Sequence, residues 1–370
     1  ASILNCQIPN PNTDKIYSMH VTIEKACLSI GGYMKSKLNV TPTSYRILTE
    51  WIEMAKKLEG KINTNSQDIE IIIETIPKRK SKLLAFRWYG GKYSHLDWLL
   101  PLLPKAHHFC EPFAGSAAVL LNREPSPVET LNDIDGEVTN FFKVLRDKPE
   151  ELIKRLYLTP FSREEYKKAI LAKWNKNLDE IERARLFFVR AEQVRIGLAQ
   201  SATVGRWAWC KNTSRRGMAG AVSRWLNRIE ALWFVAERLK RVQIENDDAF
   251  NVIKRYDSEE TLFYCDPPYV HESRGDPNAY GYEMSEHQHR KLADLLHSVK
   301  GMVALSGYRC QLLDELYADW IRIDAPPKIA HSVKELRTES LWINYDLELI
   351  GEETIAWLKR KGCKFNIPKK

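Results

Sequence analysis

The sequence predicts an α/β protein built on a doubly wound, parallel sheet, because short apolar runs alternate with helical patterns from residue 83 onward. A basic, tryptophan-rich and helical stretch over residues 151–242 interrupts this alternation. We therefore expect a discontinuous sheet domain over residues 83–150 and 243–350, with residues 151–242 as a helical insertion. The apolar runs that we expect to form strands lie at residues 107–111, 129–133, 262–265, 302–305 and 341–345.

Residues 1–82 differ from this pattern and predict a small accessory module that ends in a basic linker. Residues 44–58 have helical periodicity, and residues 68–76 have the apolar character of a strand. The periodicity fits a DNA-reading helix-turn-helix, and it fits equally a small domain packed on the core. At the other end of the chain, residues 351–370 form a basic tail.

Composition narrows the class of protein. With 44% hydrophobic and 28% charged residues, the 370-residue chain can fill a hydrophobic core and is not disordered over most of its length. It has no apolar run long enough to span a membrane, and its first residues do not resemble a secretory signal. The seven cysteines are scattered, which excludes paired zinc-ligand spacing and suits a reducing compartment. We expect a cytoplasmic protein without a metal ion.

A glycine-containing turn follows the predicted strand at 107–111 and precedes a helix. Gly115 lets the backbone approach a nucleotide-type ligand closely, although an ordinary strand–turn–helix has the same pattern. Asp133 stands at the end of the next predicted strand, where a carboxylate can accept hydrogen bonds from ribose hydroxyls. The third glycine of the dinucleotide fingerprint is missing, and no pyrophosphate cradle is present. This combination favours S-adenosylmethionine, which has an adenosine and no phosphate.

Asp266, Pro267, Pro268 and Tyr269 follow the apolar run at 262–265 and give the strongest signal in the chain. Two prolines cannot continue a central strand, so the chain must turn out at the strand's carboxyl end, where ligands bind in such sheets. The Asp266 carboxylate and the Pro267 carbonyl can accept hydrogens of an amino-purine, and Tyr269 can stack on the base. We therefore expect these four residues to be catalytic.

A further short segment contains Trp88, Gly90, Gly91 and Lys92 and lies just before the glycine-containing turn. Its lysine and its aromatic side chain could hold a carboxylate and a flat ring. A surface turn with a solvated lysine would have the same sequence. The position directly before the turn favours a role in ligand binding.

The insertion interleaves positive charge with aromatic side chains. Lysine and arginine neutralise phosphates, and arginine can also read guanine edges. A solvated helix face would give a similar composition, but the neighbouring Asp-Pro-Pro-Tyr sequence favours nucleic-acid binding. The residues that we expect to contact DNA are Arg206, Lys211, Arg215, Arg216 and Arg224.

Together these segments resemble the Dam family of DNA adenine-N6 methyltransferases over residues 86–350, and their order along the chain is that of the alpha subgroup. The resemblance implies a Rossmann-like methyltransferase sheet, a target-recognition insertion, and S-adenosylmethionine as methyl donor with S-adenosylhomocysteine as product. Ala117 replaces a family glycine, and the insertion does not reproduce the segment that reads GATC, so that specificity is not carried over. The residues that the resemblance assigns to donor binding are Trp88, Gly90, Gly91, Lys92, Glu111, Phe113, Gly115, Asp133, Asp248 and Asp266.

The resemblance also implies methyl transfer to N6 of an adenine that is flipped out of duplex DNA. Cytosine-N4 methylation, RNA adenine methylation and an inactive DNA-specificity subunit are the alternatives. Asp266 favours adenine, because Ser-Pro-Pro-Tyr is commoner for cytosine, and the intact Lys92 and Asp133 argue against an inactive subunit. The recognition sequence, a partner restriction endonuclease and the oligomeric state stay open.

Overall fold

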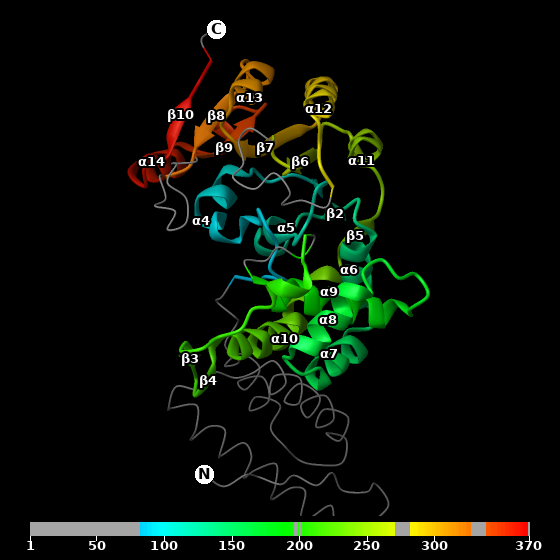
Figure 1. Cartoon of the computed structure of the whole chain (residues 1–370). Helices are drawn as coiled ribbons and strands as arrows, with labels where there is room; N and C mark the ends of the chain where they lie inside the picture. The colour runs from blue at the N-terminus through cyan, green and yellow to red at the C-terminus, as the bar shows by residue number, and fades with distance from the viewer. Residues whose placement is uncertain (1–81, 196–198, 200, 271–281, 327–337, 369–370) are drawn as a thin grey trace, which may run out of the picture. The chain divides into compact units, whose positions relative to one another are not determined.

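The computed structural model describes residues 82–195, 199, 201–270, 282–326 and 338–368. Its centre is an eight-stranded sheet with the order β10-β8-β9-β7-β6-β1-β2-β5 (Figure 1). Residues 1–81 of the expected N-terminal module lie outside the described residues. The strands of this sheet are β1 (His108–Glu111), β2 (Val128–Asn132), β5 (Gln243–Glu245), β6 (Thr261–Cys265), β7 (Met302–Tyr308), β8 (Ile321–Asp324), β9 (Glu339–Ile343) and β10 (Lys364–Asn366).

All five strands predicted for the sheet domain are present, and the α/β class is confirmed. The strand predicted at residues 68–76 lies outside the described residues. β5, β2, β1, β6 and β7 pair in parallel, as a doubly wound sheet requires. The remaining part differs from the expected parallel sheet, because β9, β8 and β10 pair antiparallel. The sequence did not predict β5, β8 and β10. These strands are three or four residues long and are partly exposed at or next to the sheet edges, so they lack the apolar run of a central strand.

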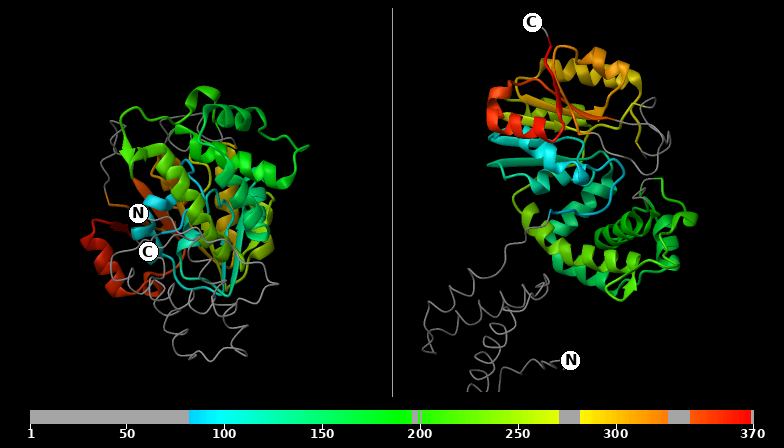
Figure 2. Two further views of the ribbon diagram at one scale, coloured as in Figure 1. Left: turned by 90° about the horizontal axis from the view of Figure 1, so that it is seen from below. Right: turned by 90° about the vertical axis from the view of Figure 1, so that its left-hand side faces the viewer.

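Helices cover both faces of the sheet (Figure 2), and Figure 1 shows α11, α12 and α13 along one side and α4 and α5 along the other. Side chains of the central strands alternate between the faces. Cys110 and Phe263 join one apolar cluster, with α11 and α12, while Phe109 and Leu262 join the other, with α5 and α6. The helices are α4 (Leu96–Leu99), α5 (Ala118–Asn122), α6 (Gly136–Asp147), α7 (Pro149–Leu158), α8 (Arg163–Leu171), α9 (Glu180–Gln193), α10 (Gly220–Leu239), α11 (Ala249–Tyr256), α12 (Glu286–Ser298), α13 (Gln311–Leu316) and α14 (Glu352–Arg360).

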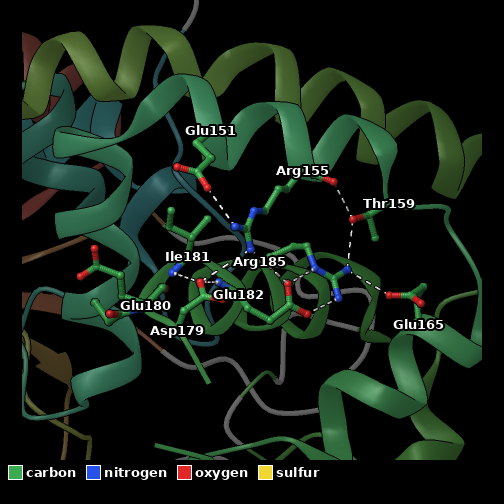
Figure 3. Close-up of polar contacts among 10 residues, drawn as sticks. Glu151, Arg155, Thr159, Glu165, Asp179, Glu180, Ile181, Glu182 and Arg185 are labelled. Atoms are coloured by element: carbon green, nitrogen blue, oxygen red, sulfur yellow. Dashed lines mark hydrogen bonds and ion pairs between the residues drawn. The ribbon is translucent and has the colours of Figure 1, made fainter. Parts of the chain in front are cut away.

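Charged side chains join the helices of the insertion, and Figure 3 shows the centre of this network. Arg185 of α9 donates to both carboxylate oxygens of Glu182, at 2.8 and 2.6 Å. The same guanidinium donates to Glu165 of α8 at 2.9 Å and to Thr159 at the end of α7 at 3.1 Å. Asp179 caps the start of α9 by accepting from two backbone N–H groups. Arg185 therefore connects α7, α8 and α9 through its hydrogen bonds.

The sequence predicted a helical insertion, but the insertion is not helical throughout. Strands β3 (Ser214–Arg215) and β4 (Met218–Ala219) form a hairpin immediately before α10. Arg216 and Gly217 join them with φ angles of 53° and 74°, and two positive φ angles are typical of the tight turns that suit hairpins. Two-residue strands carry no periodicity, so only the Arg-Gly pair could have indicated this turn.

The expected basic tail is folded as far as the structure describes it. α14 packs through the buried side chain of Leu358, and Cys363 is buried after it. β10 then pairs antiparallel with β8, with Lys364 opposite Asp324. Residues 352–366 therefore contribute a helix and the outermost strand to this end of the sheet.

Candidate active site

The centre of the sheet brings the two strongest sequence motifs together. β1 and β6 are neighbours, and the chain continues from β1 to β2 on one side and from β6 to β7 on the other. In doubly wound sheets, ligands bind at the carboxyl ends of the strands at such a point. The glycine-containing turn follows β1 there, and Asp266 follows β6.

A buried lysine links these two motifs. Lys92, in a short 3₁₀ turn (Lys92–Ser94), is only 4% exposed. Its Nζ lies 2.8 Å from Oδ1 of Asp266, 2.8 Å from the carbonyl oxygen of Gly90 and 3.5 Å from Oε1 of Glu339. Burial lowers the pKa of Lys92, but the carboxylates of Asp266 and Glu339 more than offset this, and the pKa lies above its ordinary value. Lys92 is therefore an internal cation with fixed partners, and the solvated-lysine alternative is wrong.

The hydrogen bonds of Asp266 leave one of its oxygens available. Oδ1 accepts from Lys92 and, at 2.9 Å, from the hydroxyl of Ser306 on β7. Tyr264 donates in turn to the Ser306 hydroxyl at 3.0 Å. Within the described part of the chain no donor lies within hydrogen-bond distance of Oδ2, and the side chain is 17% exposed. One carboxylate oxygen is thus held in place while the other can accept from a ligand.

Tyr269 is fixed by three neighbours. Its hydroxyl donates to Oε1 of Glu339, and the ammonium of Lys92 lies 4.8 Å from the centre of its ring. The ring of Tyr308 packs edge-on against it, with 4.8 Å between the two ring centres. The side chain is 4% exposed. Its expected stacking on a base stays a prediction.

The turn after β1 has the backbone geometry that a close ligand requires. Gly115 has a φ of 49°, and a Cβ placed on it would lie 2.7 Å from the indole of Trp88. Ala117, where the related family has glycine, also has a positive φ, of 50°. Trp88 therefore lies against this turn and joins the Gly-Gly-Lys segment to it. Glu111 is buried and accepts from the N–H of Leu120, and burial raises its pKa well above the ordinary range.

Asp133 lies at the end of β2 and faces the same turn. Its Oδ2 accepts from the N–H of Gly115 at 2.8 Å, and its Oδ1 accepts from the N–H of Asp135 at 2.9 Å. Burial, together with the nearby Asp135 carboxylate, raises the pKa of Asp133 to about 7, although the two backbone hydrogen bonds lower it. Each oxygen keeps a second lone pair with which to accept from a ligand hydroxyl.

Two asparagines that were not among the predicted site residues organise this region. The buried Asn132 donates to the carbonyls of Pro112 and Asp247 at 2.9 and 3.0 Å and accepts from the Asp247 N–H at 2.9 Å. Asn246 donates to the carbonyl of Asp133 at 2.8 Å. Asp248 caps the start of α11, and its carboxylate accepts a hydrogen bond from the N–H of Phe250. This carboxylate therefore already stabilises the helix, whether or not it also contacts a ligand.

A cavity of about 600 Å³ is lined by residues that directly follow Asp133 and by residues of α6 and α9, and Asp133 itself does not line it. Ile134, Asn246 and Tyr282 are part of its lining, and Ile134 is 51% exposed. The exposed Ile134 side chain is an apolar surface directly after the carboxylate that faces the turn. Phe113 is half-buried and packs on the α11 side of the sheet, away from the cluster that contains α5.

The predicted DNA-contacting residues have different environments. Lys211, Arg215, Arg216 and Arg224 are exposed, and Arg216 donates to Asn227 on α10 at 2.7 Å. The basic side chains of the hairpin are therefore available to a partner. Arg206 is half-buried, and its Nη1 is buried without a hydrogen-bond partner among the residues that the structure describes.

Within the same described residues, no group of three histidine, cysteine, aspartate or glutamate side chains could hold a metal ion. None of the helices described is long and apolar enough to cross a membrane.

The sheet and the site at its carboxyl edge define the class of protein, which is that of the α/β methyltransferases. Residues 88–338 match the D12 class of N6 adenine-specific DNA methyltransferases, and the chain belongs to this family. The predicted resemblance to the Dam family is thereby confirmed. Membership of the family implies a methyl donor.

Several curated proteins are similar to this chain. It is 24% identical to the DNA N-6-adenine-methyltransferase of Escherichia phage P1 over 258 residues, which are 66% of this chain and 32% of the phage protein. It is 26% identical to the DNA adenine methylase of Vibrio cholerae over 197 residues, which are 52% of this chain and 66% of that enzyme. It is also 26% identical to the type II methyltransferase M1.LlaDCHI of Lactococcus lactis over 268 residues, 66% and 88% of the two chains. The chain thus spans about a third of the phage relative's length and about two thirds of the Vibrio relative's length.

Proposed function

We propose that this chain transfers a methyl group from S-adenosylmethionine to N6 of adenine in duplex DNA. The observation that carries this proposal is the state of Asp266: its Oδ1 is held by Lys92 and Ser306, while its Oδ2 remains available beside the turn that follows β1. Methylation of an exocyclic amine requires a fixed hydrogen-bond acceptor for the amine next to the site that binds the methyl donor.

The residues around the turn fit S-adenosylmethionine. Asp133 has lone pairs for two ribose hydroxyls, and Ile134 offers apolar surface to an adenine ring. Gly115 and Trp88 leave no room for a side chain at the turn, so a ligand there meets backbone. S-adenosylmethionine supplies an electrophilic methyl group on a sulfonium. Lys92, Asp133 and Trp88 are proposed to orient it.

The chemistry that falls to the protein is activation of a poor nucleophile. The lone pair of the adenine N6 is delocalised into the ring, and a carboxylate that accepts one of its hydrogens draws it toward a reactive geometry. Asp266 Oδ2 and the Pro267 carbonyl are the acceptors that the chain provides at this place. As the methyl group arrives, N6 becomes positively charged, and Asp266 stabilises that charge and can accept the released proton. No covalent intermediate with the protein is needed.

The hairpin of the insertion is the proposed first contact with DNA. Arg215, the last residue of β3, and Arg216, in the turn that follows it, are exposed before α10, and Lys211 and Arg224 are exposed near them along the chain. A target adenine must leave the base stack to reach Asp266, so the insertion must hold the duplex while the base is flipped. Arg215 and Arg216 would supply phosphate contacts for this.

Replacing Asp266 by asparagine tests the proposed acceptor. Lys92 has only donors, so the amide oxygen of Asp266→Asn must face Lys92, and the amide NH₂ then takes the place of Oδ2. The asparagine NH₂ and the N6 amine would then be two hydrogen-bond donors facing each other. We expect the single-turnover rate of methyl transfer to fall by about 10²-fold or more. Ser306→Ala removes one hydrogen-bond donor to Asp266 and no charge, so its single-turnover rate should fall much less. A folded Asp266→Asn protein with near-normal turnover would contradict the assigned role.

Donor affinity should depend on pH through Asp133. The carboxylate is the form that accepts from ribose hydroxyls, and a pKa of about 7 means that this form is lost as the pH falls through neutrality. The Kd for S-adenosylmethionine should therefore be about tenfold higher at pH 6 than at pH 8. Calorimetry measures both values. Asp133→Asn should bind weakly at both pH values, and an unchanged pH dependence in this variant would move the ribose site elsewhere.

The salt dependence of DNA binding tests the hairpin. Each phosphate contact that is removed should reduce the slope of log K against log salt concentration by about 0.9. Arg215→Ala/Arg216→Ala should therefore bind duplex DNA more weakly and with a shallower slope. Lys105→Ala, whose side chain is 91% exposed outside the insertion, is the control. Equal affinity and slope for the hairpin variant and the control would exclude the hairpin as the main contact.

A further inference from the structure

A second buried carboxylate lies in the site and has no part in the chemistry described above. Glu339 is the first residue of β9 and is 5% exposed. Because β9 runs antiparallel to β7, its first residue lies at the edge where β7 ends, opposite Tyr308. This places Oε1 of Glu339 3.5 Å from Lys92 Nζ and in contact with the Tyr269 hydroxyl.

The charges around Lys92 are unequal in number. One ammonium faces two carboxylates, those of Asp266 and Glu339, so the cluster has a formal charge of −1 when both are ionised. Among the residues that the structure describes, Tyr269 contacts Glu339, Tyr264 interacts with it and Tyr308 lies opposite it on β7. The buried Glu111 faces Lys92 and Asp266, and burial raises its pKa well above the ordinary range. Burial raises the pKa of Glu339, Lys92 lowers it, and Asp266 raises it, with the result above the ordinary value.

A purely structural cluster would not need this arrangement. A buried carboxylate carries a desolvation cost, and a single Lys–Asp pair would already balance its own charge. Tyr269 could also be held by a neutral acceptor. The additional carboxylate is therefore explained best by a task in which its charge matters.

We propose that Glu339 is a positioning residue for methyl transfer: it holds Lys92 and Tyr269 in place and keeps the pocket around Asp266 net negative. This inference rests on the proposed function. Lys92 alone would neutralise the field of Asp266 at the target amine, and Glu339 restores one negative charge. During transfer, positive charge leaves the donor sulfonium and arrives at N6, beside Asp266. A negative pocket favours that movement.

The effect should appear in the rate rather than in binding. The charge at N6 is fully present only in the transition state, and interactions made there change kcat and leave ground-state binding nearly unaltered. Glu339→Gln is the informative variant, because its amide oxygen can still accept from Tyr269 while the negative charge is gone. Its side chain has the same length and nearly the same volume.

The test compares Glu339→Gln with the wild-type full-length chain on duplex DNA. We expect the single-turnover rate to fall by about tenfold to a hundredfold, with the Kd for S-adenosylmethionine and the KM for DNA within about twofold. With both ligands saturating, the wild-type rate should fall with decreasing pH as Glu339 takes up its proton, and this step should be missing in Glu339→Gln. Ser340→Ala is the control. It changes the next residue of β9, whose hydroxyl donates to Asp324 at 2.7 Å outside the Lys92 cluster, and should leave the rate unchanged.

A folded Glu339→Gln protein with a wild-type rate and pH profile would overturn the inference. So would a loss that lies entirely in donor affinity, because Glu339 would then belong to the donor site. Failure of the proposed function is distinguishable, since the wild-type chain itself would then transfer no methyl group to adenine in DNA.

Discussion

The buried ammonium of Lys92 is the interaction on which the rest of the site depends. It joins a segment at residues 88–92 to Asp266, which lies far along the chain, and to Glu339 on a third element. Two carboxylates this close and this buried would repel each other without a cation between them. Lys92 therefore fixes which oxygen of Asp266 is occupied and which remains available. The orientation of Tyr269 follows from the same cluster, through Glu339.

The sheet order explains why these elements can meet. β1 and β6 lie side by side with their carboxyl ends at one edge, and Asp133 follows β2 on the far side of β1. The antiparallel β9 then brings its beginning, rather than its end, to this edge beside β7. The residues that we propose to bind the methyl donor thus lie after β1 and β2, and those that we propose to activate the amine lie at β6, β7 and β9. Side chains of Asn132 and Asn246 connect the end of β2 and Asp133 to the loop before α11.

The sequence was informative where local chemistry restricts the choice of residue. Gly115 and the two prolines after Asp266 are demanded by backbone geometry, so the turn and the exit from β6 could be predicted. Glu339 and Ser306 could not be assigned a role, because their position depends on the direction of β9 and on the pairing of β7, which no local pattern specifies. The hairpin at Arg216 was missed for a related reason: two-residue strands are stabilised by a turn and by packing beside α10, and they leave no periodicity.

We propose that Asp266, held by Lys92, activates the N6 amine of a DNA adenine. The most direct measurement is to incubate the chain with mixed-sequence duplex DNA and isotopically labelled S-adenosylmethionine and to map every modified base. We expect label on N6 of adenine within one recurring sequence context. Label on N4 of cytosine, label on RNA in place of duplex DNA, or no transfer by a chain that binds both the donor and DNA would contradict it.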